Sequence, residues 1–202
     1  MNNIIVISGP SGSGKTTLIR MLLKEHPEIA FSVSHTTRLP RGQEKDGQDY
    51  FFISQKQFQE MIAADGFIEW AKVHGNYYGT SMQEVIKRSQ ESPFLALDID
   101  VQGARIVRGK LPNALFVLVT PPSIEALEKR ILHREKTITP EFQRRIQMAI
   151  EELKAYKIYD YTVVNDILND AFNVLNGIFL AYKNTTARNE ALLKQIIEHK
   201  KI

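Results

Sequence analysis

The sequence predicts an α/β domain that is built around a mainly parallel sheet. Apolar runs rich in β-branched residues, at residues 4–7, 94–97 and 115–119, are typical of parallel strands buried on both faces. Segments with helical spacing of apolar residues lie between these runs, and alternation of strands with helices favours this fold class. A chain of 202 residues is expected to form one core that carries small inserts.

The expected elements have recognisable boundaries. Glycines at residues 9–14 end the first strand, and the helix that follows, over residues 16–24, stops before Pro27. Ser123 is a suitable N-cap for a helix that runs to about residue 134. The remaining expected elements are a helix over residues 141–156, a strand over residues 161–164 and a final helix from about residue 170.

Two stretches depart from the alternation of strands and helices. Residues 33–81 are rich in Thr, Arg, Gly and aromatic residues, and we expect them to form a small β-containing insert. Residues 129–145 include a polar stretch that we expect to form a mobile lid. The core would then consist of residues 1–32, 82–128 and 146–202.

The composition excludes several classes of protein. Hydrophobic residues make up 43% of the chain, which is enough for a buried core, and the net charge of +3 suits a polyphosphate cleft. We expect no nucleic-acid partner, because no basic run with interleaved aromatic residues occurs. The lack of cysteine excludes disulfides and thiolate nucleophiles. Without a secretory signal or a stretch of roughly 20 apolar residues, a cytoplasmic protein with no membrane partner is expected.

Residues 9–16 read Gly-Pro-Ser-Gly-Ser-Gly-Lys-Thr, which matches the phosphate-loop (P-loop) pattern G-x-x-x-x-G-K-[ST] in full. Its glycines let backbone N–H groups surround the phosphates of ATP, and Lys15 would reach the β- and γ-phosphates. The Thr16 hydroxyl and Asp98, at the end of a predicted strand, are expected to hold Mg²⁺. A chance glycine-rich turn is the alternative, which the position between strand and helix disfavours. The expected ATP-binding residues of this segment are Gly9, Ser11, Gly12, Ser13, Gly14, Lys15, Thr16 and Thr17.

A second segment has the chemistry of an anion site. Arg38 and Arg41 lie three apart in a stretch that contains proline, and each guanidinium can donate a pair of hydrogen bonds to a phosphate. Tyr50 and Tyr78 could add neutral donors. Taken alone, the two arginines fit a solvated basic loop better than a phosphate site.

Further motifs follow the P-loop in a fixed order. They are S-x-T-T-R-x-P-R from Ser34, F-I-E-W from Phe67, G-N-Y-Y-G-T from Gly75 and L-D-I-D-V-Q-G from Leu97. With the P-loop, this series resembles the guanylate kinase family of nucleoside-monophosphate kinases, as far as V-V-N-D at residues 163–166. The resemblance implies a three-layer P-loop fold with a monophosphate-binding insert and a lid.

The resemblance also implies roles for single residues. Arg38, Arg41, Tyr50 and Tyr78 would hold the phosphate of GMP, and Ser34, Glu69, Thr80 and Asp100 would surround the guanine. A carboxylate can accept both the N1–H and the exocyclic amine of guanine, whereas adenine would leave it unpaired, at a cost of about 1–3 kcal/mol. Without the surrounding motifs, Glu69 would read as a surface carboxylate beside Trp70.

In the lid, the resemblance implies that three arginines close on the transferred phosphoryl group and that Asn165 lies beside the donor adenine. These arginines are Arg130, Arg134 and Arg145, whereas Arg144 is expected to be a solvated helix residue.

Two features depart from the family pattern. Glu135 stands where the family usually has glycine, which puts the flexibility of the lid in doubt. The tail, residues 184–202, runs past the usual end of the family. Its apolar Ala191, Leu192, Ile196 and Ile197 suggest an extended helix that packs on another surface.

The implied reaction converts ATP and GMP, and also dGMP, into ADP and GDP or dGDP by in-line transfer. One alternative is a related small-molecule kinase, such as a ribose-bisphosphate kinase, and Glu69 in a base-reading motif argues against it. The other is a non-catalytic guanylate-kinase-like binding module, which the intact Lys15 and Thr16 disfavour. The sequence leaves open whether the protein is a monomer or a homo-oligomer.

Overall fold

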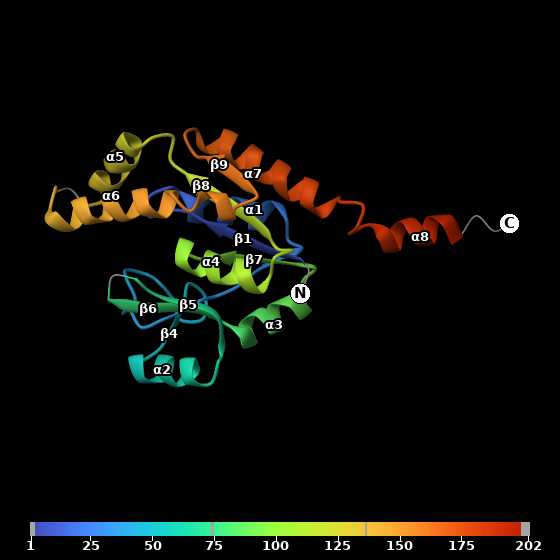
Figure 1. Cartoon of the computed structure of the whole chain (residues 1–202), viewed down its shortest axis with the longest axis horizontal. Coiled ribbons are helices and arrows are strands. Elements are labelled where there is room, and N and C mark those ends of the chain that lie inside the picture. Colours follow the sequence, from blue (N-terminus) through green and yellow to red (C-terminus); the bar gives the residue numbers. More distant parts are fainter. Residues whose placement is uncertain (1–2, 74, 136, 199–202) are drawn as a thin grey trace.

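A five-stranded sheet lies at the centre of the computed structural model, which describes residues 3–73, 75–135 and 137–198 (Figure 1). All neighbouring strands are parallel, as the sequence predicts. Their order across the sheet is β2 (Ile29–Phe31), β7 (Phe94–Asp98), β1 (Ile4–Ser8), β8 (Leu115–Thr120) and β9 (Tyr161–Val164). The carboxyl ends of β1 and β7 therefore lie side by side, which is where ligands bind in open parallel sheets.

Both faces of the sheet are covered by helices. Helices α1 (Lys15–Glu25) and α7 (Leu168–Lys183) pack with Ile5 and Ile7 of β1 on one face. Ile4 and Val6 point to the other face, where α3 (Met82–Glu91) and α4 (Val101–Lys110) contribute to a second apolar cluster. Successive side chains of a strand alternate between faces, so two covered faces require the continuous apolar run at residues 4–7.

The insert forms its own four-stranded sheet, with the order β4 (Phe51–Phe52), β3 (His35–Thr36), β6 (Asn76–Ser81) and β5 (Phe67–Val73). Helix α2 (Gln55–Ala63) covers it, and the fully buried Phe58 stacks on Phe67 and Tyr77 with ring centroids 4.4 and 5.2 Å apart. These contacts confirm the expected β-containing insert. Its exact range, residues 33–81, stays a prediction.

Two further helices lie beyond the carboxyl end of the sheet: α5 (Ile124–Glu135) and α6 (Pro140–Leu153). They form an apolar cluster of their own, in which Leu127 and Ile131 meet Phe142 and Ile146. The Thr139 hydroxyl caps α6 by accepting the backbone N–H of Phe142 at 3.1 Å. The lid range 129–145 begins and ends inside these helices, and it stays a prediction.

Two expected helix boundaries are wrong by two or three residues. The helix predicted over residues 141–156 ends at Leu153, because the backbone tightens there into i→i−3 hydrogen bonds, such as that from Ala155 to Glu152, and then forms a 3₁₀ turn at Tyr156–Ile158. The last helix of the core begins at Leu168, before the expected residue 170.

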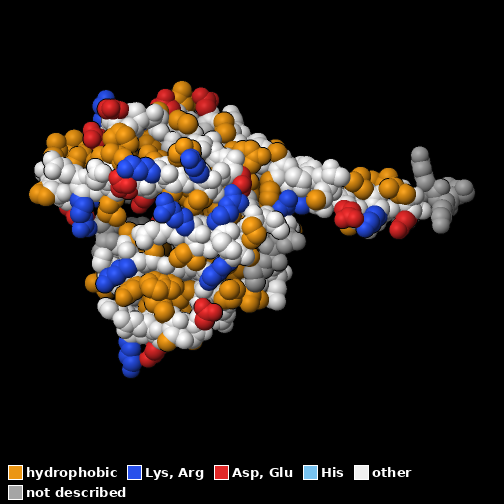
Figure 2. Space-filling view, viewed as in Figure 1, with side chains coloured by type: hydrophobic (Ala, Val, Ile, Leu, Met, Phe, Trp, Pro, Cys, Tyr) orange, Lys and Arg blue, Asp and Glu red, His pale blue; other side chains and the backbone are white. Residues whose placement is uncertain are grey.

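The tail contains the helix that the sequence predicts, α8 (Glu190–Glu198), which projects away from the core (Figure 2). Its large apolar side chains, from Leu192 to Ile197, are between 41% and 71% exposed. The expected packing of this helix is therefore not made by the described part of the chain. Among the described residues, no helix is both long enough and apolar enough to cross a membrane.

Removing the aromatic centre of the insert should destabilise the protein. We expect Phe58→Ala to lower the free energy of unfolding by roughly 3–5 kcal/mol, because it leaves a cavity between Phe67 and Tyr77. Urea denaturation measures this change. Leu39→Ala is the control: its side chain is 83% exposed, so its loss should change stability by less than about 0.5 kcal/mol. A loss below about 1 kcal/mol for Phe58→Ala would contradict this role of the stack.

Candidate active site

The P-loop between β1 and α1 depends on three glycines that have positive φ angles. These are Gly9, Gly12 and Gly14, with φ of 154°, 92° and 86°. A Cβ on Gly9 would lie 2.1 Å from the Val119 carbonyl oxygen, and one on Gly14 would lie 2.2 Å from Nδ2 of Asn165. The loop therefore wraps closely against β8 and the end of β9, and only glycine fits at these two positions.

Asn165 supports this loop from the end of β9. Its Nδ2 donates to the carbonyl oxygen of Ser13 at 2.8 Å, and its backbone N–H donates to Thr120 at 2.8 Å. Its own carbonyl oxygen accepts a hydrogen bond from the Arg130 guanidinium at 2.7 Å. A contact between Asn165 and the donor adenine stays a prediction. A cavity of about 360 Å³ beside it, lined by Gly12, Gly14, Lys129, Arg130 and His133, is large enough to accept part of a nucleotide.

The P-loop lysine already has an anionic partner. Nζ of Lys15 forms an ion pair with Asp98 at the end of β7 and lies 3.4 Å from the carbonyl oxygen of Ile99. Thr16, in the first turn of α1, and Asp98 both line a cavity of about 220 Å³. An exposed Thr17 follows in the same turn. The residues that the sequence assigns to the phosphates and to the metal are thus brought together.

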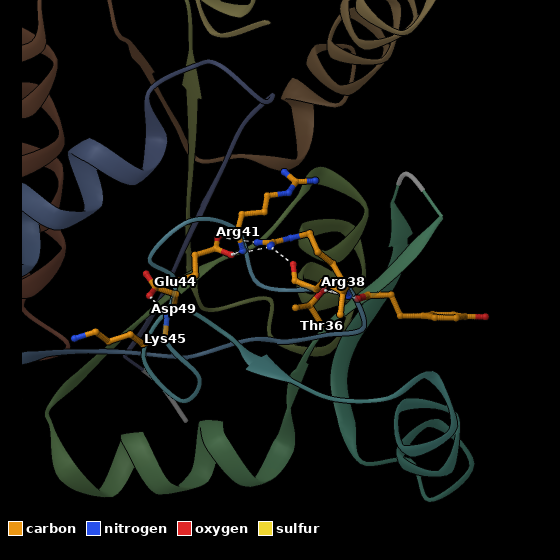
Figure 3. Close-up of polar contacts among 8 residues, drawn as sticks. Thr36, Arg38, Arg41, Glu44, Lys45 and Asp49 are labelled. Atoms are coloured by element: carbon orange, nitrogen blue, oxygen red, sulfur yellow. Dashed lines mark hydrogen bonds and ion pairs between the residues drawn. The ribbon is translucent and has the colours of Figure 1, made fainter.

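The Arg38 guanidinium is bound by a carboxylate that the sequence analysis did not identify (Figure 3). Its Nη1 and Nη2 donate to the two oxygens of Glu44 at 2.7 and 2.8 Å. Oε2 of Glu44 also accepts the backbone N–H of Arg41 at 2.7 Å, which ties the turn between the two arginines together. The contact with Arg38 holds the pKa of Glu44 below its usual value and raises the pKa of Arg38. The available signal was Glu44 three residues after Arg41 in a turn, where its carboxylate can accept a backbone N–H.

The other predicted phosphate ligands surround this pair. The Arg38 guanidinium lies 5.1 Å from the centre of the Tyr50 ring, and the rings of Tyr50 and Tyr78 are 6.0 Å apart. Burial raises the pKa of Tyr50 to about 12, so its hydroxyl is a donor at neutral pH. Arg41 and Tyr78 line, together with the P-loop, a cavity of about 530 Å³. Lys and Arg side chains gather along this side of the molecule, where the core meets the insert (Figure 2).

The predicted guanine ligands form the far end of the site. Glu69 is only 4% exposed, and its Oε1 accepts the backbone N–H of Thr80 at 2.8 Å. The Thr80 hydroxyl is buried and lies 3.3 Å from that of Ser34. An irregularity in the pairing of β5 with β6, between Phe67 and Glu69, accompanies the inward position of Glu69. Asp100 completes the group and accepts the backbone N–H of Gly103 at 2.8 Å.

Among the described side chains of α5 and α6, Arg145 makes a direct contact with the P-loop. Nη2 of Arg145 donates to the hydroxyl of Ser11 at 2.8 Å. Arg144 is exposed and forms an ion pair with Glu141 at 3.3 Å, as expected of a solvated helix residue. The side chain of Arg134 lies outside the described residues, and its role stays a prediction.

Comparison with known proteins identifies the family. A model of the guanylate kinase family matches residues 1–182. The chain belongs to the guanylate kinase family. It is 42% identical over 96% of its length to guanylate kinase of Caldanaerobacter subterraneus, of which it covers 95%, and 45% identical over 96% to that of Symbiobacterium thermophilum, of which it covers 93%. The crystal structure of guanylate kinase from Anaplasma phagocytophilum superposes with a TM-score of 0.78 at 28% identity, covering 98% of this chain and 95% of that one.

In this guanylate kinase family member, Glu152 is a second acidic residue that the sequence analysis missed. It extends from α6 into the cavity that the P-loop and Arg145 line. Burial, with the nearby charge of Asp100, raises its pKa to about 7. Its position depends on how α6 folds over the P-loop, so no local sequence pattern indicates it.

Burial raises the pKa of Glu69 to about 7 from the 4.5 of an unfolded chain. The stability contributed by this shift is fully present below pH 4.5 and is lost as the pH rises through 7, since the folded state must then hold a buried charge. We therefore expect Glu69→Gln, which keeps an acceptor for Thr80, to raise Tm relative to the parent protein at pH 8 and much less at pH 5.

Thermal unfolding from pH 5 to 8 tests this expectation. Glu152 and Asp100 are present in both proteins, so the difference between their two curves reports the carboxylate at position 69 together with its interaction with Asp100. A Tm difference that stays constant over this pH range would contradict the burial effect.

Proposed function

We propose that this protein transfers the γ-phosphoryl group of ATP to GMP, giving ADP and GDP. The main support for this proposal is that the P-loop and most of the expected acceptor residues line two adjoining cavities. The P-loop, Arg41 and Tyr78 line one cavity, and Tyr50 and the buried Glu69 line the cavity that adjoins it. Lys15, Tyr78 and Asp100 line both. The same assignment extends to dGMP, because none of the proposed contacts uses the 2′-hydroxyl of the ribose.

The acceptor would bind with its phosphate between Arg38 and Arg41 and its guanine against Glu69. The Glu44 carboxylate holds Arg38 in place with two hydrogen bonds, and the two tyrosine hydroxyls add donors without adding charge. At the other end, Glu69 would accept the N1–H and the exocyclic amine of guanine, with Ser34, Thr80 and Asp100 around it. Ionisation of Glu69 is then stabilised by the bound base.

Phosphoryl transfer between these sites needs no strong general base, because the attacking phosphate oxygen of GMP is already largely ionised at neutral pH. Catalysis would rest on alignment and on charge neutralisation. Lys15 would leave Asp98 for the β- and γ-phosphates, and Arg145, which already contacts the P-loop at Ser11, would stabilise the charge of the transferred group together with Arg130 and Arg134. Closure of the insert and the lid would exclude water and limit hydrolysis of ATP.

Thr16 and Asp98 fit a magnesium ion. Mg²⁺ prefers oxygen donors and takes only one or two ligands from the protein when it binds with nucleotide phosphates. A hydroxyl and a carboxylate that line one cavity beside the P-loop meet this requirement. When bound, Mg²⁺ would neutralise charge on the phosphates. We place the protein in the cytoplasm, where ATP and GMP are available.

The two alternatives lack support. A ribose-bisphosphate kinase binds no base in its acceptor site, so it would not need a buried carboxylate flanked by Thr80 and Asp100 there. A non-catalytic module does not require the P-loop geometry that Gly9 and Gly14 maintain here.

Release of ADP with different acceptors tests the function. We expect rapid ADP formation with GMP and dGMP, and little with AMP, UMP or CMP. Lys15→Ala should abolish transfer with all of them while calorimetry still detects GMP binding, because Lys15 serves the donor phosphates. Equal activity with AMP and GMP would refute the proposed substrate. Loss of GMP affinity in Lys15→Ala would refute the division into donor and acceptor sites.

Base selection is tested separately. We expect Glu69→Gln to lower kcat/KM for GMP by about 2–4 kcal/mol in transition-state free energy, because the amide turns one acceptor into a donor that faces a donor on guanine. IMP lacks the exocyclic amine, so the loss with IMP should be smaller. The measurement is kcat/KM for GMP, IMP and AMP with both proteins. If the preference for GMP over IMP is unchanged, Glu69 does not read the amine.

A further inference from the structure

Gly103 lies where the two acidic residues of the guanine end converge. It is buried in the first turn of α4, and its backbone N–H donates to Oδ1 of Asp100 at 2.8 Å. An ideal Cβ on Gly103 would lie 2.5 Å from Oε2 and 3.1 Å from Cδ of Glu69. The same Cβ would lie 3.3 Å from Oδ1 of Asp100. The Glu69 carboxylate therefore packs directly against the α-carbon of Gly103.

The Glu69 side chain has little freedom to move away from such a Cβ. Its Oε1 is held by the Thr80 N–H at 2.8 Å, and the side chain is nearly completely buried. A swing away from α4 would break that bond and leave a buried N–H unpaired. The φ angle of Gly103 is not in the left-handed region, so backbone conformation does not require glycine here. Glycine is required at position 103 because a Cβ there would clash with the Glu69 carboxylate.

We propose that Gly103 is a positioning residue for base selectivity: its lack of a side chain sets the place and direction of the Glu69 carboxylate, and so the preference for purines with an N1–H beside an exocyclic 2-amino group. The inference rests on the proposed reading of guanine by Glu69. Gly103 itself touches no substrate in this scheme. It acts through Glu69, and through Asp100 to a smaller extent because that Cβ distance is longer.

The chain offers a matched control in the same helix. Gly109 is also in α4, it is exposed, and a Cβ there would meet nothing within 4 Å. Alanine favours a helix over glycine, so Gly109→Ala should raise Tm slightly and leave kinetics unchanged. Gly103→Ala makes the same chemical change in the same element, and any difference between the two variants reports the contact with Glu69.

The experiment measures kcat and KM for GMP and IMP. In Gly103→Ala we expect kcat/KM for GMP to fall roughly tenfold or more, mainly through KM, and the GMP-over-IMP preference to fall with it. The KM for ATP should stay within about twofold, since the donor site lies elsewhere. Equal losses for GMP and IMP would overturn the inference, because a merely structural defect does not distinguish the two bases.

A second variant links the effect to Glu69. Aspartate is shorter by one methylene, so Glu69→Asp should relieve the contact with a Cβ at position 103. We expect the effects of Gly103→Ala and Glu69→Asp to be non-additive, with the double variant retaining more GMP activity than the product of the two single losses predicts. Additive losses would overturn the inference. If Gly103→Ala does not fold, Glu69→Asp should restore folding, and failure to do so would overturn the inference as well.

Glu69→Gln, measured in parallel, distinguishes a failure of the role proposed for Gly103 from a failure of the proposed contact between Glu69 and guanine. If Glu69→Gln leaves the GMP-over-IMP preference unchanged, the reading of guanine by Glu69 is wrong, and the role of Gly103 is wrong with it. If Glu69→Gln lowers the preference and Gly103→Ala does not, only the role of Gly103 is overturned.

Discussion

The backbone of the P-loop is packed so closely against its neighbours that the order of the strands is part of the binding site. Gly9 lies against the carbonyl of Val119 at the end of β8, and Gly14 lies against the Asn165 side chain just after β9. Both contacts require β8 to pair with β1 on one side and with β9 on the other, in the observed register. A shift of either strand would remove the surface on which the loop is formed. The parallel sheet thus shapes the phosphate site directly.

On each side of the cleft, a cationic side chain is held by an ion pair with a carboxylate. Lys15 pairs with Asp98, and Arg38 pairs with Glu44, so a carboxylate of the same chain neutralises a group assigned to phosphate. These partners reduce the repulsion among clustered cations and hold long side chains in one direction. At the proposed guanine end the situation is reversed. Glu69 is buried with no cation bonded to it among the described residues, and burial raises its pKa. That carboxylate is suited to a ligand that brings hydrogen-bond donors.

The sequence predicted four strands of the central sheet and the P-loop because their signals are local, whereas the roles of the acceptor residues come from the family resemblance and stay predictions. Residues 4–7 carry a continuous apolar run, and the phosphate motif combines fixed spacing with a strand before it and a helix after it. Elements without such signals were not predicted individually. Strand β2 has only three residues, and α4 contains two glycines, which weaken helix propensity. Glu152 and the support by Asn165 depend on contacts between distant segments, which no local pattern encodes.

Among the described residues, α5 and α6 share an apolar cluster in which no buried member comes from the central sheet. The residues that fill the two faces of that sheet belong to separate clusters. A rigid-body rotation of the helix pair would leave the apolar surface of the sheet covered, but it would change the packing of Leu127 and Ile131 against Gly12 of the P-loop as well as polar contacts such as that between Arg145 and Ser11. Under the proposed closure of the lid, substitutions in the two sheet clusters would change resistance to heat, whereas substitutions where the helix pair meets the P-loop would change the speed of closure.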